Sequence, residues 1–395
     1  MEGDFIRVNK ALLPLSWLYG LAVGVRNMLF DVGLFRSRAF EIPVIAVGNI
    51  TVGGTGKTPH VEYLTDLLRK YCRVAVLSRG YKRKSKGFLK AAEGTTMTEI
   101  GDEPYQMRRK FPDVTVAVDK NRCHGIDVLT AEDKTLDVIL LDDAFQHRYV
   151  KPGINILLVD YHRLIIYDKL LPAGRLREPL SGKSRADIVI VTKCPRNMKP
   201  MEYRVITKAM SLYPFQMLFF TSLEYGRLRP VFKEGGARQG TCDPNDPEQL
   251  RQCHVLLLTG IASPRQMIQD MTPRVASLTP LTYRDHHAFT AKDIRAINQT
   301  LDDLPEPRII ITTEKDTVRL EQTEGLSPEA RACLYEQPVK PCFMQEQESN
   351  FNNHIIDYVH KNSRNSILVK RKDDHKSDNS HHTGNRPRTI SFRNY

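Results

Sequence analysis

An apolar run that passes directly into a glycine-rich loop is the feature that most constrains the fold of this chain. Residues 42–47 read Ile-Pro-Val-Ile-Ala-Val, and the loop that follows ends in Gly56-Lys57-Thr58. Pro59 suits the first turn of a helix, so the segment predicts a strand, a loop and a helix in that order. In such loops backbone N–H groups surround phosphate oxygens, the lysine reaches the terminal phosphates and the hydroxyl binds Mg²⁺. We therefore expect a nucleoside triphosphate site.

The whole loop is expected to bind this nucleotide. Its residues are Thr51, Val52, Gly53, Gly54, Thr55, Gly56, Lys57 and Thr58. The general pattern GxxxxGK[ST] begins with a glycine, and Thr51 holds that position here. A chance glycine turn before a helix is the alternative, but the order of strand, loop, Lys-Thr and proline favours nucleotide binding.

Further apolar runs recur, with helix-length stretches between them. In the first half of the chain they cover residues 42–47, 73–77, 114–118, 137–141, 154–159 and 187–191. Continuous apolar runs, rather than alternation, are typical of a parallel sheet that is covered on both faces. We predict an α/β fold of the P-loop NTPase type, a doubly wound parallel sheet with its ligand loops at the carboxyl ends of the strands.

A second set of runs predicts a second, smaller α/β domain. Its expected strands are residues 217–221, 254–259 and 308–313, with helical patterns around 264–271 and 291–301. A length of 395 residues also favours two domains. The predicted divisions are an N-terminal helix region (1–36), the P-loop core (37–215), the smaller domain (216–361) and a basic, disordered tail (362–395). Residues 234–249 are rich in Gly, Asp and Pro and predict a loop.

The N-terminal region contains an uncharged apolar segment, residues 11–25, between Lys10 and Arg26. It is shorter than the ~20 residues of a spanning helix. Acidic residues precede it and no clear cleavage site follows, which disfavours a signal peptide. Trp17, Tyr19 and the flanking basic residues suit a helix in a membrane interface. An ordinary buried helix is an equally good interpretation.

The net charge of +12 indicates an anionic partner or an anionic surface, and nucleic acid, anionic lipid or a phosphorylated substrate would each suit it. Nucleic acid is not expected, because aromatic residues are not interleaved with the basic ones. Seven scattered cysteines without a CxxC pair predict reduced thiols in a cytosolic protein and no zinc site. We expect a monomer.

Acidic residues follow the strand predicted at 137–141. Asp142 and Asp143 would hold Mg²⁺ opposite the loop, although an Asp pair can also cap a turn. His147 comes shortly after and should face the same crevice. Arg122 and Arg175 follow strand ends, where arginine suits phosphate recognition.

Two further motifs carry candidate acid–base groups. Asp102 and Glu103 precede a helix, and either carboxylate could accept the proton of an attacking hydroxyl, although acidic residues are ordinary at helix starts. His286 and His287 suit an acid–base or carboxylate-orienting role better than metal ligation. The run Thr-Glu-Lys-Asp at 313–316 could line a nucleotide or form a structural turn, and both interpretations stay open.

Taken in order, these motifs resemble those of the tetraacyldisaccharide 4'-kinase family of lipid A biosynthesis. They are residues 51–59, 77–81, 101–104, 142–148, 175–178, 285–287 and 313–316. The resemblance covers about residues 10–355 and leaves the tail out. Thr51 is the family's own form, whereas Ala144 stands where the family more often has glycine.

The resemblance implies ATP-dependent phosphorylation of the 4'-hydroxyl of a tetraacylated glucosamine disaccharide 1-phosphate. It implies a peripheral protein at the cytoplasmic face of the bacterial inner membrane. The resemblance implies that Lys57 and Thr58 bind phosphate and Mg²⁺ and that Asp142 and Asp143 bind the metal. It implies that Asp102 is the catalytic base, with His286 hydrogen-bonded to it. It also implies lipid contacts by Arg122, His147 and Arg175. The rival interpretation is a P-loop ATPase or GTPase that acts as a switch without a hydroxyl acceptor.

Overall fold

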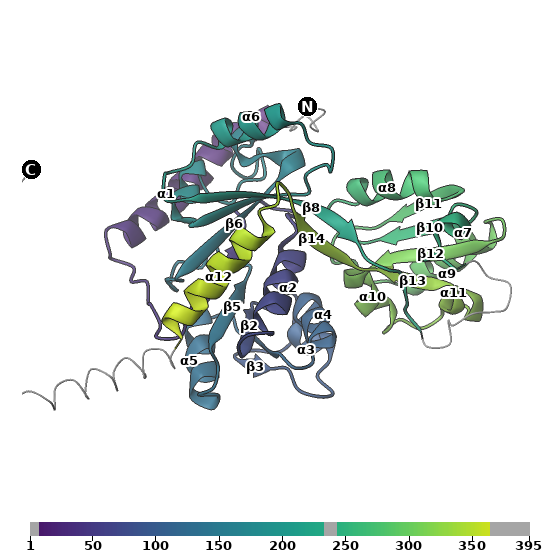
Figure 1. Cartoon of the computed structure of the whole chain (residues 1–395), viewed down its shortest axis with the longest axis horizontal. Coiled ribbons are helices and arrows are strands. Elements are labelled where there is room, and N and C mark those ends of the chain that lie inside the picture. Colours follow the sequence, from purple (N-terminus) through teal and green to yellow (C-terminus); the bar gives the residue numbers. More distant parts are fainter. Residues whose placement is uncertain (1–7, 233–242, 364–395) are drawn as a thin grey trace, which may run out of the picture.

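Two β-sheets organise the residues that the computed structural model describes, 8–232 and 243–363. In Figure 1 the larger sheet and its helices lie on the left and the smaller sheet on the right. The strands of the larger sheet are β1 (Val44–Gly48), β2 (Val74–Ser78), β3 (Leu89–Lys90), β4 (Thr115–Val118), β5 (Val138–Asp142), β6 (Ile154–Asp160), β7 (Ile188–Thr192), β8 (Met217–Tyr225) and β14 (Val339–Phe343). Their spatial order is β14-β8-β7-β6-β1-β5-β2-β4-β3.

This sheet is parallel except at its two edges, where β3 and β14 run antiparallel to their neighbours. Every residue of β1, β2, β5 and β7 is buried, as the continuous apolar runs predict. Its helices are α1 (Leu13–Asp31), α2 (Lys57–Leu68), α3 (Met97–Ile100), α4 (Asp102–Lys110), α5 (Arg122–Glu132), α6 (Pro200–Met210) and α12 (Glu348–Asn362). Short 3-10 turns are η1 (Lys10–Leu12), η2 (Tyr161–Arg163), η3 (Ile165–Tyr167) and η4 (Leu180–Arg185).

Helices cover both faces of the larger sheet. On one face α2, α4 and α12 contribute Leu64, Met107 and Ile355 to a core shared with the strands. On the other face α5 contributes Ile126 and Leu129 to a separate core. Burial on both sides explains why the strands carry no polar alternation.

The smaller sheet is also mostly parallel. Its strands are β9 (Arg229–Pro230), β10 (His254–Thr259), β11 (Ser277–Thr282), β12 (Arg308–Thr313) and β13 (Leu334–Gln337), in the order β11-β10-β12-β13-β9. Its helices are α7 (Pro247–Leu250), α8 (Arg265–Met271), η5 (Thr272–Arg274), α9 (Ala291–Asp302), α10 (Glu314–Leu320) and α11 (Pro328–Ala332).

The predicted boundary between residues 215 and 216 does not separate the two sheets. β8, β14 and α12 fall inside the predicted smaller domain, yet the two strands join the larger sheet and α12 packs on it. The chain leaves the larger sheet through β8 and returns through β14, which pairs with β8 so that Val339 lies opposite Tyr225. Because β14 pairs with a strand far from it in sequence, no pattern within β14 itself predicts this pairing.

The described cysteines bear on the prediction of reduced thiols. Cys253 is disulfide-bonded, so the prediction of reduced thiols is wrong at this residue. Sequence spacing does not reveal which thiols lie together in space. The other described cysteines are free: Cys72, Cys123, Cys194, Cys333 and Cys342. Residues 364–395, most of the predicted tail, and 233–242 in the predicted loop lie outside the described residues.

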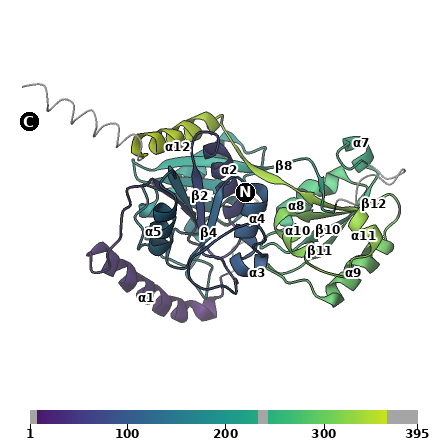
Figure 2. The same cartoon turned by 90° about the horizontal axis from the view of Figure 1, so that it is seen from below.

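Helix α1 lies along the outside of the larger unit and is attached by one face only (Figures 1 and 2). The Ser16 hydroxyl donates to the Leu170 carbonyl at 3.0 Å, and the Tyr19 hydroxyl donates to the Arg177 carbonyl at 2.8 Å. Only Ser16 and Phe30 of this helix are buried, which excludes an ordinary buried helix. Within the described ranges, no helix is both long and apolar enough to cross a bilayer.

Candidate active site

The glycine-rich loop connects β1 to α2 at the carboxyl edge of the larger sheet. Its first part pairs with a neighbouring strand-like segment, since the Val52 N–H donates to the Arg175 carbonyl at 2.8 Å and Thr51 bridges Leu176. Among the described loop residues, positive φ is confined to Gly53 (120°) and Gly56 (79°). Thr51 therefore needs no glycine conformation, which explains how a β-branched residue can begin the loop.

Lys57 and Thr58 point toward acidic side chains at the same edge of the sheet. The Lys57 ammonium lies 3.1 Å from Asp143 Oδ1, and the Thr58 hydroxyl donates to Glu103 Oε1 at 3.4 Å. Burial acts to raise the pKa of Asp143, but the charges of Lys57 and Arg177 outweigh it and hold that pKa below its usual value. The lysine thus has a counter-ion at the position where a terminal phosphate would approach.

Asp142 is the carboxylate at the tip of β5, and it is only 3% exposed. Its Oδ2 accepts a hydrogen bond from the Ser78 hydroxyl at 3.3 Å, while its buried Oδ1 has no partner. Burial first, and then the neighbouring charges of Glu103 and Asp143, raise the pKa of Asp142 well above its usual range. An unpartnered carboxylate oxygen held among acidic neighbours is suited to a divalent cation.

The donor set at this place fits Mg²⁺, which prefers oxygen ligands and is usually held by one or two carboxylates together with substrate phosphates. Asp142, Glu103 and the Thr58 hydroxyl supply such oxygens. In the part of the chain that the structure describes, no group of three His, Cys, Asp or Glu side chains could hold a metal by itself. The site is therefore one that phosphate oxygens would complete.

Asp102 begins α4 and is brought together with His286 of the smaller unit. His286 Nδ1 lies 2.7 Å from Asp102 Oδ2, and Arg319 donates to the same oxygen. His286 Nε2 lies 3.1 Å from the Lys315 ammonium, so the ring accepts there and carries its proton on Nδ1. Burial acts to raise the pKa of Asp102, but the hydrogen bond from His286 and the charges of Lys315 and Arg319 hold that pKa far below its usual range.

The three residues predicted to contact a lipid substrate lie in different environments. Arg122 is 2% exposed and donates to the backbone carbonyls of Asp119 and Asp142, so it lies beneath the site rather than in it. Arg175 is exposed, and its guanidinium lies near Gly53 of the loop.

His147 is half-buried, and its Nε2 has no hydrogen-bond partner. Burial first, and then the charges of Arg122, Arg26 and Arg79, lower the pKa of His147 to about 4. The ring is therefore neutral near pH 7, with a nitrogen left over for a ligand.

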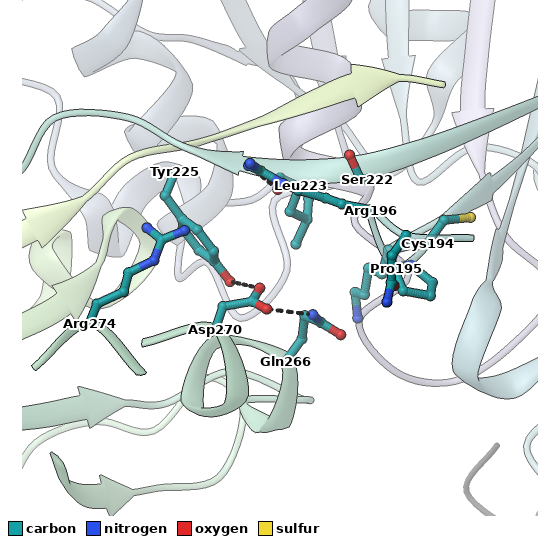
Figure 3. A pocket seen from close by; sticks show the side chains of 11 residues that line it. Cys194, Pro195, Arg196, Ser222, Leu223, Tyr225, Gln266, Asp270 and Arg274 are labelled. Atoms are coloured by element: carbon teal, nitrogen blue, oxygen red, sulfur yellow. Dashed lines mark hydrogen bonds between the residues drawn. The ribbon is translucent and has the colours of Figure 1, made fainter. Parts of the chain in front are cut away.

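A cavity of about 250 Å³ lies between the two units beside the loop (Figure 3). Lys193 lines it and also donates to the Gly54 carbonyl of the loop. On the opposite wall, Asp270 accepts hydrogen bonds from the Tyr225 hydroxyl and from Gln266, each at 2.9 Å. Lys193 therefore contacts both the cavity and the phosphate loop.

Sequence reasoning missed several residues of this site. Glu103 was considered only as an alternative base, whereas it lies beside Thr58. No role is predicted for Lys193, Lys315 appears only within the run at 313–316, and Arg319 lies outside every predicted motif. The run at 313–316 was the signal that pointed toward the last two, but their partners are on α4, more than 200 residues earlier in the chain.

The chain is similar to known proteins of one family. A family model described as Tetraacyldisaccharide-1-P 4'-kinase matches residues 8–359. The Tetraacyldisaccharide 4'-kinase of Phocaeicola vulgatus is 56% identical over 369 residues, which cover 93% of this chain and 99% of that protein. The protein of the same name from Porphyromonas gingivalis strain W83 is 45% identical over 363 residues, covering 90% and 99%.

One solved structure is similar over most of its length. The crystal structure of LpxK from Aquifex aeolicus in complex with ATP has a TM-score of 0.64 and 31% sequence identity, and covers 88% of this chain and 98% of that one. The predicted α/β fold of the P-loop kinase type, with a smaller second unit and an N-terminal helix, is confirmed.

Proposed function

The chain belongs to the tetraacyldisaccharide-1-P 4'-kinase family, and from this premise we infer that it transfers the γ-phosphoryl group of ATP to the 4'-hydroxyl of tetraacyldisaccharide 1-phosphate in lipid A biosynthesis. The observation that carries the inference is the meeting of two half-sites. A phosphate loop from the larger unit lies near an Asp–His pair completed by the smaller unit, since Glu103, next to Asp102, contacts both Thr58 and Lys315.

The donor half binds and orients the triphosphate. Backbone N–H groups of the loop surround the phosphates, and the Lys57 ammonium exchanges Asp143 for a terminal phosphate. Asp142, Glu103 and Thr58 would hold Mg²⁺, as Asp143 would once Lys57 has left it. The metal would neutralise the charge that develops on the phosphates.

The acceptor half positions the hydroxyl. A low pKa keeps Asp102 ionised at every physiological pH, so its carboxylate always accepts a hydrogen bond. A strongly basic group is not required, because phosphoryl transfer passes through a loose transition state in which positioning contributes most. His286 and Arg319 contact the Asp102 carboxylate, which takes the proton of the 4'-hydroxyl as its oxygen bonds to the γ-phosphorus and the bond from that phosphorus to the ADP oxygen breaks, so that ADP leaves.

The cavity in Figure 3 suits the nucleoside of ATP. Lys193 lines the cavity and also contacts Gly54 of the loop, so the cavity lies next to the place proposed for the phosphates. The polar wall formed by Tyr225, Asp270 and Gln266 offers hydrogen-bonding groups to a base.

On the other side of the loop, Arg175 and His147 are available to the lipid disaccharide, whereas Arg122 acts through its buried charge. The exposed apolar face of α1 and the net charge of +12 suit peripheral binding to an anionic leaflet, at the cytoplasmic face of the inner membrane where ATP is available.

The test is transfer of radiolabelled γ-phosphate to tetraacyldisaccharide 1-phosphate in detergent micelles. We expect labelled lipid from the wild-type chain and a loss of about 100- to 1,000-fold in Lys57→Ala and Asp102→Asn. Lys70→Ala is the matched control, because the Lys70 side chain is 57% exposed and pairs only with Asp66 at the surface. Rapid ATP hydrolysis without labelled lipid would instead identify a nucleotide-driven switch.

A further inference from the structure

The charged run at residues 313–316 opens α10, and its side chains face the half of the site that binds the acceptor. Figures 1 and 2 both show α10 beside α4. Glu314 pairs with Lys110 of α4 at 2.8 Å, and Lys315 pairs with Glu103 at 3.3 Å. Asp316, the last residue of the run, instead pairs within its own helix with Arg319 at 2.9 Å.

Arg319 is the residue through which α10 reaches the proposed base. It is 6% exposed, and its two terminal nitrogens have different carboxylate partners. One donates to Asp102 Oδ2, the oxygen that also contacts His286, and the other donates to Asp316 Oδ1. The planar guanidinium group therefore fixes the direction of both carboxylates at once.

The support behind Arg319 is rigid. Asp316 is fully buried, and its Oδ2 accepts hydrogen bonds from the Gly260 N–H at 2.8 Å and from the Thr313 hydroxyl at 2.7 Å. A Cβ atom on Gly260, which directly follows β10, would lie only 2.8 Å from Asp316 Oδ1, so the backbone at this point packs closely against α10. One terminal nitrogen of Arg319 is thus held by Asp316 while the other contacts Asp102.

We propose that Arg319 is a positioning residue for phosphoryl transfer: it locks the Asp102 carboxylate in the orientation in which Oδ1 meets the acceptor hydroxyl. This inference rests on the proposed kinase function. Oδ2 is already occupied by Arg319 and His286, whereas Oδ1 accepts only the N–H of Glu103, at 3.2 Å. Without Arg319 only His286 would hold Oδ2, and one contact restrains rotation of the carboxylate about its last bond less than two do.

The experiment measures kcat and KM for ATP and for the lipid in a set of variants. We expect Arg319→Met to lower kcat about 100-fold with both KM values within about twofold of wild type, since a small misplacement of a reacting group has an effect of this size. Arg319→Lys should recover part of kcat, because an ammonium keeps the charge but cannot hold two carboxylates in fixed geometry.

Two further variants separate positioning from stability. Arg319→Met leaves Asp316 buried without its cation, so the double variant Asp316→Asn/Arg319→Met should recover thermal stability while kcat stays low. Arg109→Gln removes a different ion pair between α4 and α10, with Glu321 at 2.9 Å, and should leave kcat unchanged.

Recovery of kcat together with stability in the double variant, or an equal loss of kcat in Arg109→Gln, would overturn the positioning role. A wild-type kcat in Arg319→Met would overturn it as well. Absence of lipid phosphorylation by the wild-type chain would instead count against the proposed function itself, so the two failures are distinguishable.

Discussion

His60, on the first turns of α2, joins the nucleotide loop to the larger sheet. Its Nδ1 lies 2.7 Å from the Gly56 carbonyl and its Nε2 lies 3.0 Å from the Thr221 hydroxyl. The neutral ring satisfies both partners, since it donates from Nδ1 to the carbonyl and accepts at Nε2. Burial lowers the pKa of His60 to about 4, so folding favours the uncharged ring.

This residue should make stability depend on pH. Because the pKa of His60 is lower in the folded than in the unfolded chain, protons favour the unfolded chain as pH falls from about 6.5 to about 4. The contribution of His60 to the free energy of unfolding should fall by about 3 kcal/mol across this window. Urea unfolding of His60→Gln should therefore show a shallower decline than wild type.

His360→Gln is the matched control, because that histidine is exposed in the last turn of α12. It should follow the wild-type decline. Equal slopes for wild type and His60→Gln would contradict the assignment of the effect to His60.

Whether the contacts of a single residue can be predicted depends on how its partners are placed along the sequence. Lys57, Thr58 and Asp142 follow strands in a known order, so their meeting at one edge of a parallel sheet is predictable. The contact of Arg319 with Asp102 is not, because it depends on how two separately folded units dock. Motif order alone links Asp102 to His286, without indicating which other charges surround them.

Helix α1 presents a broad apolar face to solvent. Its exposed side chains are Leu15, Trp17, Leu18, Leu21, Val25 and Met28. Ordinary soluble proteins rarely leave a continuous apolar surface of this kind, which marks a protein or membrane contact. The basic residues that flank the segment favour an anionic lipid surface.

We expect the double variant Leu18→Glu/Leu21→Glu to weaken binding to anionic phospholipid vesicles by about 100-fold, because each leucine would lose its burial in the lipid. The two side chains belong to residues that are 65% and 67% exposed, so thermal stability should change little. Co-sedimentation with vesicles measures the effect.

Tyr71→Glu introduces a charge at a residue that is 58% exposed, just after α2, and should bind vesicles as wild type does. Unchanged binding of the leucine variant would show that the apolar face of α1 is not a lipid contact.

Elements with strong local patterns were the predictable ones. The buried parallel strands appear close to their expected positions because continuous apolar runs have few other uses. β14 reads Val-Lys-Pro-Cys-Phe, so it lacks a continuous apolar run and its place depends on pairing with β8.

At the scale of the whole molecule, the smaller unit is an insertion between two paired strands. β8 leads into it and β14 leads out, and the Gly226 N–H donates to the Pro338 carbonyl where the two crossings meet. The apolar clusters of the larger unit contain no residue from 226 to 338. The larger unit therefore holds its own core.

A chain in which residues 226–338 are replaced by Asn-Gly should fold, because this dipeptide forms a tight turn between antiparallel strands and Tyr225 already lies opposite Val339. It should still bind ATP through its loop, as measured by calorimetry, but more weakly, since Gln266 and Asp270 of the proposed nucleoside cavity are absent. It should transfer no phosphate, since His286 and Arg319 are absent. Aggregation or non-cooperative unfolding of the shortened chain would contradict its independence.

The paired crossing also determines which relative motion of the two units is easiest. Both connections run through one antiparallel ribbon, with Thr221 opposite Phe343 at one end and Tyr225 opposite Val339 at the other. Bending within the plane of this ribbon would strain the hydrogen bonds between its strands, whereas twisting along its length, to which two-stranded ribbons readily adapt, would preserve them. The ribbon is thus suited to act as a torsional joint, because the two units could rotate about the axis of β8 and β14 while these strands stay paired.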